Sequence, residues 1–208
     1  MNQQKYHAFF MRHIPKEYVE YVVQLFLHNP VRFRIVNPRK TKLGDFRSGI
    51  NGEKPQITIN NDLNPYSFLI TTVHEFAHLI THNKFGRRIA PHGTEWKNEY
   101  AKLIYPIIEM KCLPEDVEQV LLNSLIKVKA SSCSDVELQR VLVKYDFQQE
   151  DLHLLEELDK NTIFTLNNKQ YRKGNLRRTR FLCQRIDSKK EYLIHALAKV
   201  KITQQYYE

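Results

Sequence analysis

Two histidines one helical turn apart, with a glutamate between them, are the residues of this chain best suited to chemistry. His74 and His78 are four residues apart, so on a helix both imidazoles project from one face and can reach a single metal ion. Glu75 follows the first histidine and can lie beside the metal without binding it, where it can take a proton from a metal-bound water molecule. The pattern predicts the active site of a zinc hydrolase, with Glu75 as the general base.

The residues around this motif carry the signals of one amphipathic helix. Asn64 can cap its N-terminus, Pro65 suits the first helical position, and Gly86 suits a helix end. Apolar residues recur between them at three- and four-residue steps, which predicts a helix of about 18–20 residues. The stripe expected to face the core is Leu69, Val73, Phe76 and Ile80. The alternative is a pair of surface or capped histidines on such a helix, with no metal.

A catalytic zinc ion usually has three protein ligands and one open position for water, so a third ligand must come from elsewhere in the chain. His82 continues the four-residue series, but it would stand about 12 Å from His74 along the helix axis, too far to share an ion with bonds of about 2 Å. His82 is therefore expected to face solvent near the helix end. His92 follows the turn Phe85-Gly86-Arg87, after which the chain can double back, and it is the predicted third ligand.

His92 stands between two residues that restrain the backbone, Pro91 and Gly93, just before a second predicted helix. Thr94 can cap this helix. We expect Trp96 to pin the helix and so to position His92. The apolar face of the helix comprises Trp96, Tyr100, Leu103, Ile104 and Ile107.

Three short motifs, in order, give the chain a resemblance to a known family. They are His74-Glu75-Phe76-Ala77-His78, Phe85-Gly86-Arg87 and Pro91-His92-Gly93-Thr94-Glu95-Trp96. Together they resemble the SprT-like metallopeptidases, which include the eukaryotic Spartan proteases. The resemblance is densest over residues 68–98, extends from the N-terminus to about residue 112, and has a weaker echo at 160–200.

The resemblance implies that His74, His78 and His92 bind one zinc ion per chain and that Glu75 is the general base. Members of the family act as zinc proteases, and the eukaryotic members cleave proteins covalently crosslinked to DNA and are stimulated by DNA. It therefore implies a protein substrate and DNA as a partner. The alternative is a nucleic-acid-binding protein with a structural or catalytically silent zinc site. A closed site would need a fourth protein ligand, and no candidate stands out.

The C-terminal region departs from the family pattern. Many SprT-like proteins carry a C-terminal zinc ribbon built on paired cysteines, whereas residues 162–202 contain one cysteine, Cys183. A structural zinc site needs four ligands, usually in two close pairs, which Cys183 and His195 cannot supply. We expect a small β-rich subdomain that resembles the ribbon without its cysteines and depends on strand pairing alone.

Charge divides the chain into three segments. Residues 1–112 carry 16 Lys/Arg and 9 Asp/Glu (net +7), residues 113–159 carry 4 and 11 (net −7), and residues 160–208 carry 12 and 3 (net +9). We predict a SprT-like metallopeptidase core over the first segment, an acidic helical connector over the second and a basic β-rich subdomain over the third.

The periodicity of the sequence predicts an α+β fold, with a zincin-like core of helix, three-stranded sheet and helix. Pro106 should kink or end the helix that follows His92, and a capping box at Ser134 should open a later one. The remaining predicted elements are a first helix over 15–27, strands over 31–36, 42–47 and 56–59, helices near 115–127 and 134–145, and an antiparallel meander from residue 162.

A basic cluster near the C-terminus is the candidate nucleic-acid contact. Lysine and arginine neutralise phosphates, and exposed aromatic rings can stack on unpaired bases; Tyr171 lies within the cluster and Phe181 just after it. The alternatives are a solvated hairpin and a basic face docked on the acidic segment at 113–159. The cluster comprises Lys169, Arg172, Lys173, Arg177, Arg178 and Arg180.

Composition predicts a cytoplasmic monomer that does not enter membranes. The longest apolar run is four residues, against about 20 needed to span a bilayer, and the N-terminus lacks the regions of a secretory signal. Cys112, Cys133 and Cys183 are isolated and odd in number, so we expect reduced, buried thiols rather than a disulfide framework.

Overall fold

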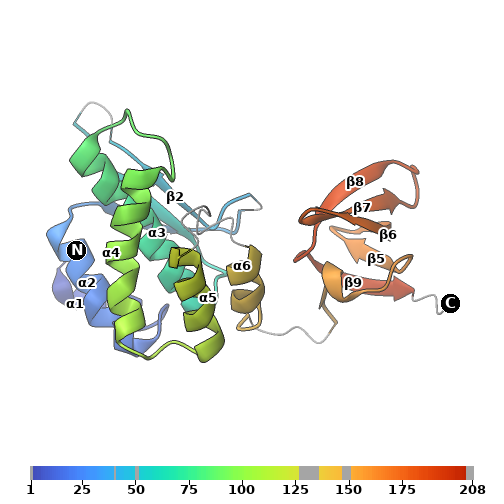
Figure 1. Ribbon diagram of the computed structural model, residues 1–208, viewed down its shortest axis with the longest axis horizontal. Coiled ribbons are helices and arrows are strands. Elements are labelled where there is room, and N and C mark those ends of the chain that lie inside the picture. Colours follow the sequence, from blue (N-terminus) through green and yellow to red (C-terminus); the bar gives the residue numbers. More distant parts are fainter. Residues whose placement is uncertain (1, 40, 50–51, 127–135, 147–150, 205–208) are drawn as a thin grey trace. The chain divides into compact units, whose positions relative to one another are not determined.

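The computed structural model describes residues 2–39, 41–49, 52–126, 136–146 and 151–204. The chain forms two compact units, Met1–Asp146 and Phe147–Glu208. The described residues contain six α-helices and two β-sheets, so the fold is of the mixed α+β class, as predicted (Figure 1). Among the described helices, none combines the length and the apolar character needed to cross a lipid bilayer.

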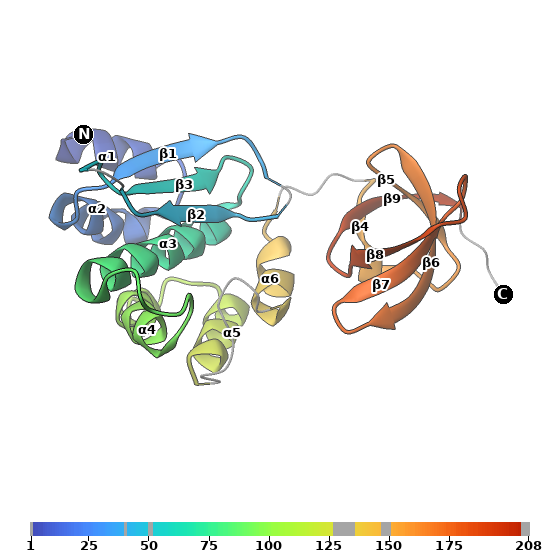
Figure 2. The same cartoon turned by 90° about the horizontal axis from the view of Figure 1, so that it is seen from above.

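The first unit contains one three-stranded sheet, which packs on helix α3 (Pro65–Phe85). Its middle strand, β3 (Gln56–Asn60), pairs in parallel with β1 (Arg32–Val36) and antiparallel with β2 (Gly44–Arg47), in the order β1-β3-β2 (Figure 2). The strands fall on the three segments predicted as strands. Ile57 and Ile59 of β3 are fully buried and anchor the sheet in the core.

Two helices precede the sheet. The predicted first helix is a 3-10 turn, η1 (Lys16–Tyr18), that leads into α2 (Val19–His28), and an earlier helix, α1 (Gln3–Phe10), was not predicted. Aromatic rings join these helices to the rest of the core. The ring of Phe26 lies 5.0 Å from that of Phe10, 4.9 Å from that of Phe33 and 4.6 Å from that of Phe76.

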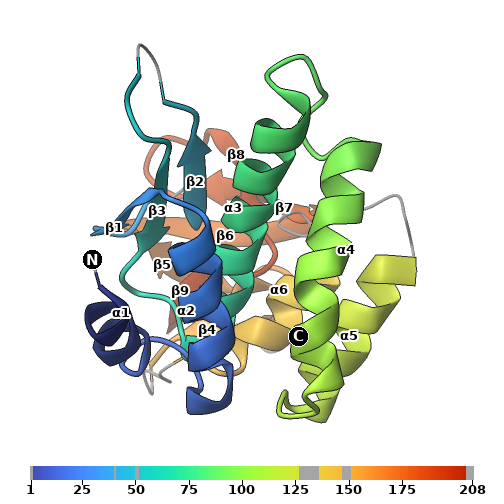
Figure 3. The same ribbon diagram turned by 90° about the vertical axis from the view of Figure 1, so that its left-hand side faces the viewer.

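The long helix α3 (Pro65–Phe85) packs between β2 and α4 (Thr94–Glu109) (Figure 3). The predicted caps of α3 are confirmed, because Asn64 Oδ1 accepts a hydrogen bond of 2.9 Å from the Ser67 N–H, and Gly86 ends the helix with a positive φ of 74°. The N-cap of α4 is Gly93, not the predicted Thr94, which is its first helical residue. Pro106 does not end α4 at once, since the helix continues to Glu109.

Helices α5 (Glu115–Ile126) and α6 (Val136–Val143) belong to the first unit, although they lie in the segment predicted as a connector. Their apolar residues join the same core as α3, and Asn64 Nδ2 donates a hydrogen bond of 2.9 Å to the Leu142 carbonyl. Ser134, where the predicted capping box begins, lies outside the described residues. The core residues contributed from this segment are Leu113, Val117, Leu121, Leu138 and Leu142.

The second unit is a curled antiparallel sheet with the strand order β4-β9-β5-β6-β7-β8 (Figure 2). Its core is small and includes Leu155, Phe164, Tyr171 and Val200. A 3-10 turn, η3 (Leu155–Glu157), follows β4. The strands are β4 (His153–Leu154), β5 (Ile163–Leu166), β6 (Lys169–Arg177), β7 (Arg180–Arg185), β8 (Glu191–His195) and β9 (Lys199–Gln204).

The cysteines only partly match the prediction of buried thiols. Cys183 is a fully buried free thiol in the core of the second unit, and burial raises its pKa. Cys112 is a free thiol but is exposed, because it follows the end of α4 at the surface. Cys133 lies outside the described residues.

Candidate metal centre

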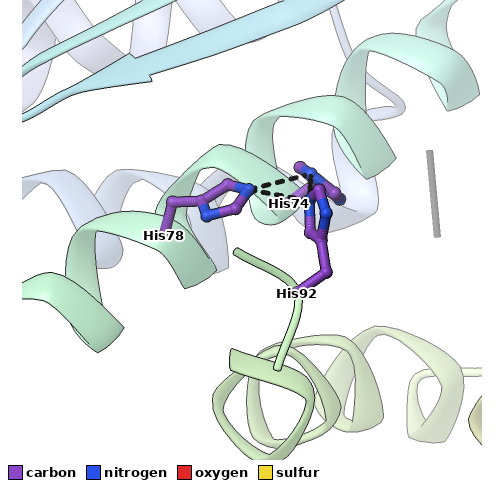
Figure 4. A group of neighbouring side chains, drawn as sticks. All are labelled: His74, His78 and His92. Atoms are coloured by element: carbon purple, nitrogen blue, oxygen red, sulfur yellow. Dashed lines mark hydrogen bonds between the residues drawn. The ribbon is translucent and has the colours of Figure 1, made fainter. Parts of the chain in front are cut away.

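Three histidine side chains converge on one point in the first unit (Figure 4). His74 and His78 project from α3, and His92 projects from the loop that precedes α4. The Nε2 atoms are 3.2 Å apart for His74 and His78, 3.0 Å for His78 and His92, and 3.1 Å for His92 and His74. These are the three residues predicted as ligands, and the structure brings all of them together.

This triangle of nitrogens fits a metal ion better than it fits hydrogen bonds. An uncharged imidazole nitrogen carries either a proton or a lone pair, so three nitrogens that face one another always leave at least one pair that repels. Two nitrogens bound to one tetrahedral zinc ion, with bonds of about 2.0–2.1 Å, are about 3.3 Å apart. The separations observed here come close to that value, so the cluster can hold a metal ion.

Burial keeps these histidines in the form that binds metals. With a smaller contribution from neighbouring histidines, it lowers the pKa of His74 to about 2 and the pKa of His78 to about 4. The pKa of His92 is also lowered, first by burial and then by the charge of Lys97. All three side chains are therefore uncharged at neutral pH, as metal binding requires.

A tight turn aims His92 back at α3. The backbone of His92 has a φ of 58°, in the left-handed region that few residues with a side chain adopt. The N–H of Gly93 donates a hydrogen bond of 2.9 Å to the Ala90 carbonyl and so closes the turn. Gly93 then starts α4, so the helix start and the position of His92 are fixed together.

Trp96 packs against all three histidines. Its ring centroid lies 4.6 Å from that of His74, 5.2 Å from that of His78 and 4.7 Å from that of His92, and the residue is only 2% exposed. The ring of Tyr100 stacks on that of Trp96, with centroids 5.0 Å apart and an angle of 9° between the rings. The histidines therefore have a rigid aromatic wall behind them.

Glu75 follows His74 on α3 and is buried, with 5% of its surface exposed. Burial, followed by the charge of Asp45, raises the pKa of Glu75 to about 8, while Arg39 and a hydrogen bond from the Phe46 backbone act in the opposite direction. A carboxyl group with this pKa can exchange a proton near neutral pH, which suits a general base.

Strand β2 approaches Glu75 very closely at Gly44. A Cβ atom at this position would lie 2.6 Å from Glu75 Oε1 and 2.7 Å from Thr71 Cγ2, closer than atoms that are not bonded can come. The strand can therefore pass over the carboxylate only because residue 44 has no side chain. Our sequence analysis missed this role, although a glycine inside a predicted strand is a known signal of close backbone approach.

His82 does not face solvent as predicted. It lines a cavity of about 500 Å³ that begins at His78 and His92 and extends between the end of β2 and the loop after α3. Both ring nitrogens of His82 are buried and have no hydrogen-bond partner among the described residues. The prediction failed because the side chain turns toward Phe46, whose ring centroid is 5.8 Å away, and toward a cavity that the loop after α3 also lines.

The basic cluster of the second unit is exposed except at one position. Lys173 is only 4% exposed; its Nζ donates to the Leu158 carbonyl and lies 4.0 Å from the centroid of the Phe181 ring. A lysine held in this way cannot also neutralise a phosphate, so Lys173 is not part of the surface. Tyr171 is also buried and cannot stack on a base. The exposed members are Lys169, Arg172, Arg177, Arg178 and Arg180.

Two known proteins resemble part of the chain. Both are named Protein SprT and come from Pseudomonas fluorescens: the Pf-5 strain (ATCC BAA-477 / NRRL B-23932) gives 44% identity over 57 residues, and strain SBW25 gives 60% over 35 residues. The matches cover 27% and 16% of this chain, but only 34% and 21% of the relatives. The chain is therefore similar to about a third of the length of one relative and about a fifth of the other.

No family model matches the chain. No solved structure matches it either.

Proposed function

We propose that this chain is a zinc-dependent metallopeptidase of the SprT-like type. The observation that carries the proposal is a triangle of histidine nitrogens that fits one metal ion, together with a buried glutamate, Glu75, that follows one of these histidines on α3. His74, His78 and His92 would bind the zinc ion, and Glu75 would be the general base. The partial similarity to proteins named SprT points to the same class.

When bound, zinc would supply Lewis acidity, which polarises the scissile carbonyl group and makes water a stronger acid. Glu75 accepts the proton of the attacking water. The backbone of Phe46 donates a hydrogen bond to the carboxylate, and the close approach of Gly44 restricts its movement. Trp96 holds the three imidazoles in place from behind, so this part of the site is preorganised. A sheet packed on the helix that bears two ligands supports a zincin-like core.

The Glu75→Gln variant tests the reaction, because it keeps the size of the side chain and removes the base. With an unfolded protein as substrate, we expect its cleavage rate to fall by at least about 10²-fold, with zinc content and thermal stability retained. Glu109→Gln is the matched control, because Glu109 is exposed at the far end of α4. Full activity of Glu75→Gln would show that Glu75 is not the general base.

Proteins bound or crosslinked to DNA are the proposed substrate class. The family resemblance suggests this class, and the exposed basic residues of β6 and β7 provide a surface to which DNA could bind. Cleavage assays test this substrate class. The zinc-loaded protein is incubated with a DNA-crosslinked protein and, separately, with the same protein in free form, each with and without added DNA. Equal cleavage under all four conditions would remove DNA from the proposal.

The second candidate is a nucleic-acid-binding protein whose zinc site is catalytically silent. The observation that favours it is the exposed cross-strand pair of Arg177 and Arg180, next to Arg178 in the turn between β6 and β7. If zinc-loaded protein bound DNA but cleaved none of these substrates, this second function would replace the first.

A further inference from the structure

The cavity next to the histidine cluster has a composition that selects one kind of ligand. It opens at two of the three metal-binding candidates, so a group bound in it would lie beside the reaction centre. Its wall combines apolar surface with basic side chains, and no aspartate or glutamate lines it among the described residues. The lining residues used below are Phe46, Arg47, His82, Arg87, Ile89 and Trp96.

His82 lacks a hydrogen-bond partner in the wall of this cavity. Both of its ring nitrogens are buried, and neither has a partner among the described residues. An uncharged imidazole has one donor and one acceptor, and buried polar groups in proteins are nearly always hydrogen-bonded. The phenyl ring of Phe46, whose centroid is 5.8 Å from that of His82, provides no such partner. Because both nitrogens are enclosed by protein atoms, the part of His82 that lines the cavity is the carbon surface of its ring, which adds to the apolar wall.

Two arginines give the cavity a positive charge. Arg87 uses one nitrogen to donate a hydrogen bond of 2.8 Å to the Gly49 carbonyl. Arg47 donates a bond of 2.8 Å from Nε to Asp45, which offsets part of its charge. A guanidinium group has five N–H donors, so Arg87 in particular keeps most of its donors and its full charge for a ligand.

We propose that this cavity binds the carboxylate of an acidic substrate side chain close to the scissile bond. Arg87 is the specificity-determining residue, because it can supply charge-assisted hydrogen bonds to the carboxylate. Phe46 and Ile89 contact the apolar part of the same side chain. The inference rests on the proposed peptidase function and adds to it a preference for glutamate or aspartate next to the bond that is cut.

Peptide binding tests the inference without turnover. Trp96 is the only tryptophan of the chain and lines the cavity, so its fluorescence reports occupancy. Zinc-loaded Glu75→Gln protein is titrated with short peptides acetylated at the N-terminus and amidated at the C-terminus, which differ only in one central residue: Glu, Gln, Leu or Lys. We expect the glutamate peptide to bind about tenfold more tightly than the glutamine peptide, because the two differ essentially in charge.

Two variants, each added to the Glu75→Gln protein, connect this preference to the cavity. Arg87→Met keeps the length of the side chain and removes its charge, and we expect the glutamate preference to disappear. Arg88→Met is the matched control, because Arg88 is exposed, adjacent in sequence and absent from the cavity wall; it should keep the preference.

Three outcomes would overturn the inference. The first is equal binding of the glutamate and glutamine peptides, and the second is an unchanged glutamate preference in Arg87→Met. The third is an all-alanine peptide with a free C-terminal carboxylate that binds as tightly as the glutamate peptide, because the cavity would then bind the ends of chains. Cleavage by the wild type distinguishes this failure from failure of the proposed function. Cleavage without acidic preference contradicts the inference alone, whereas selective binding without cleavage by the wild type contradicts the peptidase proposal.

Discussion

Replacing Gly44 with alanine should disable the proposed general base while leaving the metal cluster intact. The added Cβ atom would lie 2.6 Å from Glu75 Oε1, 2.7 Å from Glu75 Cγ and 2.7 Å from Thr71 Cγ2. Either the carboxylate or β2 must move to relieve this overlap. Because the clash involves Glu75 and not the imidazoles, we expect zinc content to remain at the wild-type level.

The size of the effect follows from the overlap. Inserting one methyl group into a packed interior costs about 1–3 kcal/mol, and for a unit of this size each kcal/mol lowers the melting temperature by about 2–4 °C. We therefore expect a decrease of about 2–12 °C. A displacement of about 1 Å at a catalytic group can reduce the rate by about 10²-fold, so peptidase activity should fall by about that factor.

The assay combines differential scanning calorimetry with cleavage of an unfolded protein, both on zinc-loaded samples. Adding Thr71→Ser to Gly44→Ala removes the clashing Cγ2 atom but not the contact with Glu75. We expect the double variant to recover part of its thermal stability and little activity. Wild-type activity and melting temperature in Gly44→Ala would refute the close approach of β2 to Glu75.

Two further predictions concern pH and the second unit. In metal-free protein, the lowered pKa values of His74 and His78 mean that each residue reduces the free energy of unfolding by about 1.4 kcal/mol per pH unit as pH falls below about 6.5. The raised pKa of Glu75 has the opposite effect: the free energy of unfolding increases by a similar amount per pH unit as pH falls from about 8 to 4.5. Urea unfolding should thus show a maximum near pH 6.5, and His78→Gln should flatten the acid side; unfolding independent of pH contradicts this. Reversing Arg177, Arg178 and Arg180 to glutamate should weaken DNA binding at low salt without changing zinc content. Unchanged DNA affinity in a folded triple variant would exclude this surface.

Local signals in the sequence were enough to predict the helix that carries the motif. Asn64, Pro65 and Gly86 act within a few residues of the helix ends, so the limits of α3 depend little on the rest of the chain. His92 was predicted as the third ligand because His82, two helical turns after His74, is too far from His74 to bind the same ion. The structure brings it to the cluster through the short turn after Ala90.

Features that depend on distant parts of the chain could not be predicted in the same way. The contact of Gly44 with Glu75 joins a strand to a helix 31 positions later. A glycine in a predicted strand signals a close approach, but nothing local identifies Glu75 as the residue that is approached. Lys173 was assigned to the surface by its charge alone, but its ammonium group faces the carbonyls near η3. A register shift between Lys173 and Leu176 changes which side chains of β6 face inward. The cavity that His82 lines is formed in part by the loop from Gly86 to His92, whose path no local signal indicates.

Zinc content of purified protein tests the central claim most directly. Wild-type protein should hold one zinc ion per chain after dialysis against a weak chelator, as measured by mass spectrometry of the metal. His92→Ala should lose most of it, because one of three ligands is gone, whereas His82→Ala should remain loaded. A His92→Ala protein that keeps its zinc, or a wild type that binds none, would contradict the assignment of the histidine cluster as a metal site.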